Sequence, residues 1–370
     1  MRIFILFLKL SYFGLITAQN TNAFHFAVIG TQSAFLFKSP EYNNIAIPSF
    51  RIWEVNISTE NNHSSSWRKL YNYPELGLSM AYTNFDHQAD LGSLASLIAY
   101  IEFPILRYRK LYSYFFIGTG LAYLEKPYNI EHNPENKAIG THFNNNTRFA
   151  LGLEYQITPS INLISRACFN HMSAGMMNLP NWGLDIPGLS LGLSYKQKHK
   201  KTLRYAKALE DSIKGSLFLK TRFGIVSKEV SHLNGPSYAV YLFSMQLGKY
   251  LTAWNKLMIG INISENKVIQ AFSENSDINR RYKLFNSNPL SIEIGDELLF
   301  SNIGFSGQIG YYLHYPYLKP APIYTRLGLQ YYFAKHLAYI GVNLKAHNAR
   351  ADYIEWCIGF QLHKKVKRWK

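Results

Sequence analysis

The sequence is poor in cysteine, in charge and in long hydrophobic runs. Its only two cysteines, Cys168 and Cys357, exclude a disulfide scaffold and a multi-cysteine metal cluster. Charged residues make up 17% of the 370 residues, whereas soluble domains have about 25%, so an ordinary cytosolic enzyme is not expected. After the first residues, no stretch of about 18 apolar residues occurs, which excludes a bundle of membrane-spanning helices.

Apolar residues are abundant, and the charge that is present is mostly basic. Apolar residues make up 47% of the chain, which excludes intrinsic disorder. Lysine and arginine number 39 against 23 acidic residues, for a net charge of +16. Two basic runs, within Lys196–Lys201 and Lys364–Lys370, hold much of the excess. They are interpreted either as contacts with anionic lipid headgroups or as a solvated linker and tail.

Residues 1–23 predict a secretory signal peptide. Arg2 precedes an apolar stretch, Ile3–Ile16, which is interrupted only by Lys9 and a few small or polar residues, and small residues follow. These are the marks of a signal peptide with cleavage after Ala18 or Ala23. The alternative is a buried first strand, which Lys9 would interrupt. No cysteine lies near the cleavage point, so a lipoprotein anchor is excluded, and we expect export to a bacterial cell envelope.

Large apolar residues alternate with small or polar ones in many short segments. Every second position is large and apolar in Phe149–Ile157, and the same alternation occurs in Leu76–Tyr82 and Leu189–Tyr195. Such alternation is typical of β-strands with one apolar face. Aromatic residues gather at segment ends, as in Tyr112–Phe116 and Tyr331–Phe333. In an exported chain these features predict an all-β fold, a transmembrane antiparallel β-barrel.

The sequence divides into two similar halves. Gly118–Tyr128 matches Gly307–Tyr317 at five of eleven positions, and Leu151–Tyr155 matches Leu327–Tyr331 at four of five, which indicates an internal duplication. About eight strands are expected in each half. Sixteen strands close either as two eight-stranded barrels or as one large barrel, and the length of the connecting segment slightly favours two. The expected boundaries are residues 24–198, 199–215 and 216–370.

Two segments are predicted not to be strands. The polar run Asn144–Thr147 predicts an exposed loop between two strands. Residues 199–215 carry apolar residues among charges and predict a basic linker with a short helix that joins the halves.

A histidine and a serine at the end of one strand are the candidates for chemistry. In Ile161–Ser173, His171 and Ser173 share the face of the larger apolar residues, which on a barrel meets lipid. Polar groups are costly there, so the pair indicates either a function or a place in the headgroup layer. A serine hydroxyl needs a base to become a nucleophile, and the base needs an orienting carboxylate. Asp185 lies just beyond a predicted turn, and the hairpin that contains this turn brings Asp185 back beside the strand.

These residues resemble a known family, the outer-membrane lipid A 3-O-deacylases, or PagL-type acyloxyacyl hydrolases. The resemblance rests on His171-Met-Ser173-Ala-Gly175, on the turn and acid in Pro180–Asp185, and on the closing strand Leu189–Tyr195. His171 and Asp185 are fourteen positions apart, as in the family. The resemblance covers mainly residues 112–197. It implies an eight-stranded barrel whose lipid-facing triad cleaves the ester-linked acyl chain at position 3 of lipid A.

The resemblance also implies a role for each site residue. Ser173 would be the nucleophile, His171 the general base and acid, and Asp185 the residue that orients the imidazole. The family usually has Asn after the nucleophile, where this chain has Ala174, so one oxyanion donor is missing. The candidates to replace it are Gly175, Asn178 and Asn181. The acid is one methylene shorter than the Glu of familiar members, so its reach depends on the hairpin.

The second half lacks the nucleophile. At the offset of 176 residues that relates Leu151 to Leu327, His171 corresponds to His347 and Ser173 to Ala349. The apolar residues nearby, Ile340, Val342 and Leu344, are at even positions, whereas His347 is at an odd position. The apolar face of this segment is therefore the face opposite to His347. We interpret residues 216–370 as a degenerate second half with a structural or substrate-supporting role.

The sequence therefore predicts an outer-membrane serine esterase that acts on lipid A or a related acylated glycolipid. Its other partners would be membrane lipids, with no nucleic acid, and no metal or organic cofactor is implied. The alternative is a non-catalytic outer-membrane barrel that serves as a porin, a transporter or a structural protein.

Overall fold

The computed structural model describes most of the chain outside its first residues. The described residues are 23–33, 49–60, 63–64, 66–85, 90–175, 177–197, 204–205, 213–229, 236–269, 288–315, 321–348 and 350–364. The predicted signal peptide lies outside them apart from Ala23, which begins the first strand.

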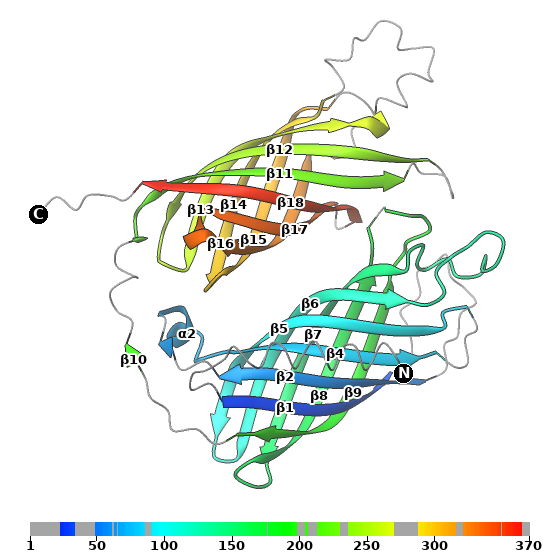
Figure 1. Cartoon of the computed structure of the whole chain (residues 1–370), viewed down its shortest axis with the longest axis vertical. Helices are drawn as coiled ribbons and strands as arrows, with labels where there is room; N and C mark the ends of the chain where they lie inside the picture. The colour runs from blue at the N-terminus through cyan, green and yellow to red at the C-terminus, as the bar shows by residue number, and fades with distance from the viewer. Residues whose placement is uncertain are drawn as a thin grey trace, which may run out of the picture.

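The first half of the chain forms a closed antiparallel barrel of eight strands (Figure 1). Its strands are β1 (Ala23–Ser33), β2 (Phe50–Glu60), β4 (Glu75–Asn84), β5 (Ser93–Tyr108), β6 (Leu111–Leu124), β7 (Phe143–Gln156), β8 (Ile161–Ser173) and β9 (Leu184–Lys196). Each strand pairs with the next, and β1 pairs with β9 to close the barrel, with Val28 opposite Leu193. The first barrel is therefore closed by strands of the first half alone.

The second half forms its own closed barrel with the same strand order. Its strands are β11 (Leu217–Glu229), β12 (Ser237–Tyr250), β13 (Asn255–Asn266), β14 (Leu290–Phe300), β15 (Ile303–His314), β16 (Ile323–Phe333), β17 (Ala338–His347) and β18 (Arg350–Lys364). β11 pairs with β18, with Leu219 opposite Leu362. The prediction of a transmembrane-type antiparallel barrel in two similar halves is confirmed, and the two halves are two barrels.

Short elements lie outside the barrels. α2 (Ser66–Leu70) follows the two-residue strand β3 (His63–Ser64), and η3 (Ala334–His336) lies between β16 and β17. In the segment predicted as a linker with a short helix, β10 (Arg204–Tyr205) pairs in parallel with β3. Within the described residues, the helices are all too short or too polar for a membrane span.

Burial alternates along the strands because their side chains point in turn into the barrel and out of it. On β7, Leu151 and Leu153 are exposed, whereas Ala150, Gly152 and Glu154 are buried. This alternation explains why one prediction is wrong. Asn144–Thr147 is part of β7 and not a loop, because its alternate asparagines point into the barrel, where polar residues are accommodated.

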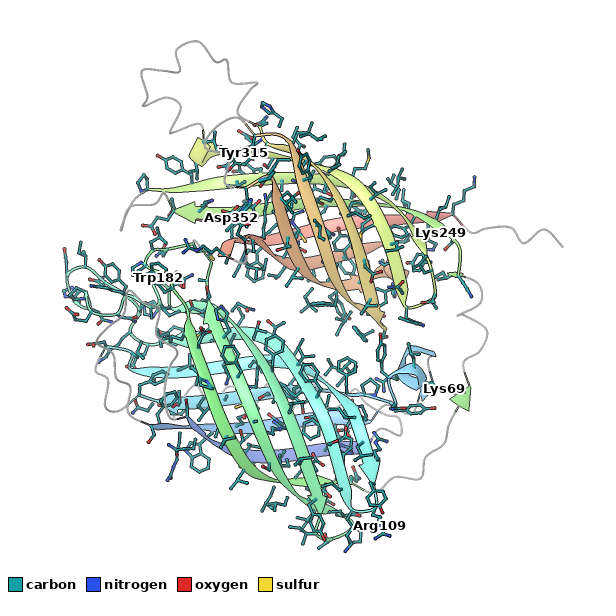
Figure 2. The ribbon with its side chains drawn as sticks, turned by 180° about the vertical axis from the view of Figure 1, so that it is seen from behind. Lys69, Arg109, Trp182, Lys249, Tyr315 and Asp352 are labelled. Atoms are coloured by element: carbon teal, nitrogen blue, oxygen red, sulfur yellow. The ribbon has the colours of Figure 1, made fainter. Side chains whose placement is uncertain are left out.

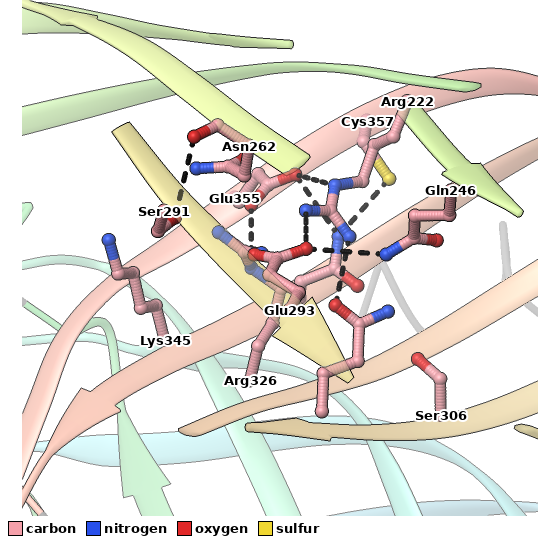
Figure 3. A network of polar contacts seen from close by, with 12 residues as sticks. Arg222, Gln246, Asn262, Ser291, Glu293, Ser306, Arg326, Lys345, Glu355 and Cys357 are labelled. Carbon is pink, nitrogen blue, oxygen red and sulfur yellow. Dashed lines mark hydrogen bonds and ion pairs between the residues drawn. The ribbon is translucent and has the colours of Figure 1, made fainter. Parts of the chain in front are cut away.

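Side chains fill both barrels, as expected for eight strands. In the second barrel, Arg222 and Arg326 contact the carboxylates of Glu293 and Glu355 (Figure 3). Buried charges are tolerated when they are paired in this way. In the first barrel, a cavity lined by interior residues has a volume of about 10 Å³, which is about the space for one water molecule.

Part of the basic charge also faces inward. Lys196, which the sequence placed in a basic run, forms an ion pair with Glu154 at 2.9 Å and a longer one with Glu75 at 3.4 Å. Its amine therefore belongs to the interior network of the first barrel. The rest of that run, 198–201, lies outside the described residues.

The two barrels contact each other at both ends. We call the end of each barrel where its first strand begins the terminal end, and the opposite end the loop end. At the terminal end, the Tyr71 ring lies 6.1 Å from the rings of Trp254 and Phe300, centroid to centroid. At the loop end, a Cβ added to Gly175 would lie 3.4 Å from the backbone nitrogen of Ile354. The barrels therefore lie beside each other with their loop ends together (Figure 1).

Candidate active site

The candidate residues lie on the outer face of the first barrel, at its loop end. On β8, Ile161 and Leu163 are exposed, and His171 and Ser173 follow at the same parity. Asn170 and Met172, at the other parity, are buried inside the barrel. His171 and Ser173 therefore project outward, continuing an apolar stripe that in a membrane barrel faces lipid.

His171 forms a hydrogen bond with the carboxylate of Asp185. The two residues are directly opposite each other in the β8–β9 pairing, and His171 Nδ1 lies 2.6 Å from Asp185 Oδ1. Their side chains are 46% and 36% exposed. Because a carboxylate only accepts hydrogen bonds, Nδ1 carries the proton. The second ring nitrogen, Nε2, is then free to accept a proton from a hydroxyl.

Ser173 receives two hydrogen bonds at its hydroxyl oxygen. The backbone N–H of Gly175 donates to Oγ at 3.1 Å, and the side-chain amide of Asn181 donates to Oγ at 3.1 Å. Among the hydrogen bonds of the described residues, none joins His171 to this hydroxyl. Bonds between a nucleophile and its base are often long in unliganded sites and shorten when substrate binds.

The loop after β8 brings these donors to the serine. We call residues 174–175 and 177–183 the site loop. Asn181 fixes its shape, because its amide also donates to the Gly175 carbonyl while its Oδ1 accepts from the Ala174 N–H at 3.5 Å. Asn178 instead donates to the carbonyl of Gly140 at 3.3 Å, in the connection between β6 and β7. Of the three oxyanion candidates, Gly175 and Asn181 therefore lie at Ser173, and Asn178 bonds elsewhere.

Gly183 gives the histidine ring its space. Its φ is +85°, a left-handed conformation that favours glycine, and its N–H donates to the Ala138 carbonyl at 3.1 Å. A Cβ at this position would lie 3.1 Å from Cε1 of His171. The glycine therefore permits the site loop to pass close to the ring.

Sequence reasoning missed a polar patch beside the pair. Asn145 and Thr147 are the cross-strand partners of Ser173 and His171, and Thr119 lies opposite Thr147 on β6. Their side chains bond to one another, with Asn145 Nδ2 donating to Thr119 Oγ1 at 2.8 Å and the Thr147 hydroxyl donating to Asn145 Oδ1 at 2.9 Å. The available signal was the alternation in Phe149–Ile157, which, when continued back through Asn144–Thr147, places the odd residues on the outer face.

The equivalent strand of the second barrel is shifted by one residue. Leu151 on β7 pairs with Ala167, whereas Leu327 on β16 pairs with Leu344, one residue beyond the position that the offset of 176 gives. The turn that carries η3 holds the extra residue. A shift of one residue turns every side chain of a strand to the other face.

His347 consequently points into the second barrel. Its Nε2 lies 3.1 Å from the hydroxyl of Tyr312, which is 2% exposed, and its Nδ1 lies 3.6 Å from a carboxylate oxygen of Asp352. The residue that corresponds in sequence to His171 is thus part of an interior network. In the described part of the chain, no group of three or more His, Cys, Asp or Glu side chains is arranged to hold a metal ion.

Solved membrane-barrel structures show only low similarity to this chain. Neisserial surface protein A (NspA) is 12% identical, with 48% of this chain and 96% of that chain covered and a TM-score of 0.31. A mutant porin of Rh. blastica is 8% identical, with coverages of 92% and 99% and a TM-score of 0.19. A mutant of the TodX monoaromatic hydrocarbon channel is 9% identical, with coverages of 95% and 92% and a TM-score of 0.18. With identities and TM-scores this low, these structures support no conclusion about this chain. Comparison with curated proteins gives no match.

Two protein-family models match the chain, one for each barrel. The model of lipid A 3-O-deacylase (PagL) matches residues 53–194, which include His171, Ser173 and Asp185. The model of the acyloxyacyl hydrolase C-terminal domain matches residues 215–364, the second barrel. Because these matches together extend across most of the chain, the protein belongs to the lipid A 3-O-deacylase (PagL) family of hydrolases that act on lipid A.

Proposed function

We propose that this protein is an outer-membrane serine esterase that removes an ester-linked acyl chain from lipid A or a related acylated glycolipid. The observation that carries the proposal is the outward placement of the His171–Asp185 pair beside Ser173. A serine activated by such a pair is suited to acyl transfer. The family match supplies the substrate class.

Each residue then has a chemical role. Ser173 Oγ attacks the ester carbonyl while His171 Nε2 takes its proton, and Asp185 holds the imidazole in the required tautomer. The Gly175 N–H and the Asn181 amide donate to the oxyanion of the tetrahedral intermediate. Collapse of the intermediate breaks the ester bond, and His171 returns the proton to the departing sugar oxygen. Water, activated by His171, then releases the fatty acid from Ser173.

The position of the site suits a substrate embedded in a membrane. An acyl chain lying along the barrel wall would follow Phe169, Leu163 and Ile161, with its ester at Ser173. The phosphorylated sugar would remain at the loop end, in the headgroup layer. We place the loop end at the outer surface of a bacterial outer membrane, after export directed by residues 1–23.

The filled interiors argue against the alternative of a porin or transporter. Arg326, Lys256 and Tyr114 are among the large side chains that are fully buried inside the barrels. Conduction would require these paired and packed groups to leave the interior. The outward-facing site needs no passage through either barrel.

The proposal is tested with purified protein and lipid A in detergent micelles. Released fatty acid and the mass of the remaining lipid are measured for wild type, Ser173→Ala and Ser165→Ala. Ser165 is the matched control, since it is an exposed serine on the same face of β8. We expect release of an ester-linked chain by wild type and Ser165→Ala and none by Ser173→Ala. Equal release by all three variants, or no release by wild type, would contradict the proposal.

A further inference from the structure

One carboxylate of the second barrel is buried at a position where its neighbours are exposed. On β11, Phe223 and Ile225 point outward and are 47% and 51% exposed. Glu229 has the same parity but is only 4% exposed. An outward side chain on a barrel is buried when something outside the barrel covers it. For a charged carboxylate this burial is costly unless a hydrogen bond compensates for it.

A hydrogen-bond donor from the site loop of the first barrel contacts Glu229. The backbone N–H of Leu179 donates a hydrogen bond to Glu229 Oε2. A bond between an N–H and an ionised carboxylate is about twice as strong as one between neutral groups. Leu179 is two residues from Asn181, whose amide reaches Ser173. The second barrel thus holds the loop close to the point where it contacts the nucleophile.

A second contact supports the same arrangement. Ile354 on β18, the strand that pairs with β11, has the parity of the exposed residues Trp356 and Ile358 but is only partly exposed. The backbone there lies against Gly175, the other residue that donates to Ser173 Oγ. Both loop residues that donate to the nucleophile are therefore next to a contact with the second barrel. Figure 2 shows the two barrels' loop ends, with Trp182 labelled in the site loop and Asp352 on β18.

We infer that the second barrel completes the active site of the first, with Glu229 as a positioning residue that holds the site loop through the Leu179 N–H. The inference rests on the proposed function of Ser173. It assigns a role to a half that has no serine of its own at the equivalent place. It also explains how a chain with Ala174 in place of the usual Asn keeps two donors at Ser173.

The physical basis is the sensitivity of catalysis to position. Oxyanion donors act only when they are held at hydrogen-bond distance from the developing charge. A displacement of about 1 Å in such a group lowers the rate by about 100-fold. Loss of the Glu229 bond removes one attachment of the loop near Asn181, while the bonds of Asn178 to Gly140 and of Gly183 to Ala138 remain. The donors are then placed less accurately, while the lipid-facing surface that binds the acyl chain is unchanged.

The test compares three variants of the full-length protein for lipid A deacylation per folded molecule. Glu229→Ala removes the acceptor, and Glu229→Gln keeps a side-chain oxygen that accepts from the Leu179 N–H. Glu265→Ala, an exposed glutamate near the loop end of β13, is the matched control. We expect kcat to fall about 10- to 100-fold in Glu229→Ala with KM changed less than about twofold, and to stay near wild type in the other two. Wild-type kcat in Glu229→Ala, or an equal loss in Glu229→Gln, would overturn the inference.

A double-mutant cycle separates positioning from general destabilisation. If Glu229 acts through the site loop, adding Glu229→Ala to Asn181→Ala costs little further activity. If the two losses multiply, Glu229 does not act through Asn181 and the inference fails.

Hydrogen exchange of the Leu179 amide gives a readout that does not depend on catalysis. Protection should be lost in Glu229→Ala and kept in Glu229→Gln. Unchanged protection in Glu229→Ala would refute the positioning role even in an active enzyme. An inactive wild type with this pattern of protection would instead refute the proposed function and retain the loop contact.

Discussion

At the scale of single residues, strand pairing compensates for the short acid. Asp185 has one methylene less than the Glu of familiar relatives, but it lies directly opposite His171 and reaches Nδ1 at 2.6 Å. The sequence showed the spacing of fourteen residues and the shared face of His171 and Ser173. It did not show which amide would reach the serine, because Asn178 and Asn181 differ only in how the loop folds.

Substitution of each triad residue is expected to reduce the rate of acyl release by a different amount. His171→Ala and Ser173→Ala should abolish acyl release, and Asp185→Ala should lower kcat by about 10⁴-fold, as loss of the orienting acid does in the triads of serine proteases. His347→Ala should keep nearly wild-type activity, because that ring lies inside the second barrel. Rates of fatty acid release from folded protein in micelles provide the check. A large loss in His347→Ala, or a mild one in His171→Ala, would contradict the assignment.

At the scale of elements, strand register decides what each segment does. The alternation of apolar residues predicted the strands and their outer faces correctly. It failed at Asn144–Thr147, since a polar run with polar residues at both parities resembles a loop, although a barrel interior also accepts asparagine. The one-residue shift at β17 was visible as a change of parity near His347. Its cause, an extra residue in the turn with η3, required the pairing register.

The turn before β9 offers a prediction with a matched control. Gly183→Ala introduces a Cβ 3.1 Å from the His171 ring at a φ of +85°. Gly215→Ala introduces the same kind of backbone strain at a φ of +82°, and among the described residues no atom beyond its two chain neighbours lies within 4 Å of the new Cβ. Both variants should lose about 1 kcal/mol of stability, measured by denaturant unfolding. Only Gly183→Ala should also lose about 10-fold or more in kcat, because it displaces the catalytic base. Equal activities would show that Gly183 has no role at the ring.

At the scale of the whole molecule, the chain is two barrels that share one site. The number of strands in each half and the connecting segment slightly favoured two barrels over one large barrel, and the pairings of β1 with β9 and of β11 with β18 show that there are two. The contacts between the barrels had no signal in the sequence. Glu229 continues the outward parity of an ordinary strand, and in the described part of the chain its hydrogen bond from the site loop distinguishes it from an exposed glutamate. Contacts that form only when two folded barrels pack together cannot be predicted from a local sequence pattern.

The most direct test of the central claim is the mass of lipid A in living cells. Lipid A is extracted from a Gram-negative host without the protein, with wild type and with Ser173→Ala, at matched amounts of folded protein in the outer membrane. The account predicts that wild type shifts lipid A down by the mass of one ester-linked acyl chain, while Ser173→Ala leaves it as in cells without the protein. An unshifted spectrum with wild type, or the same shift with Ser173→Ala, would contradict it.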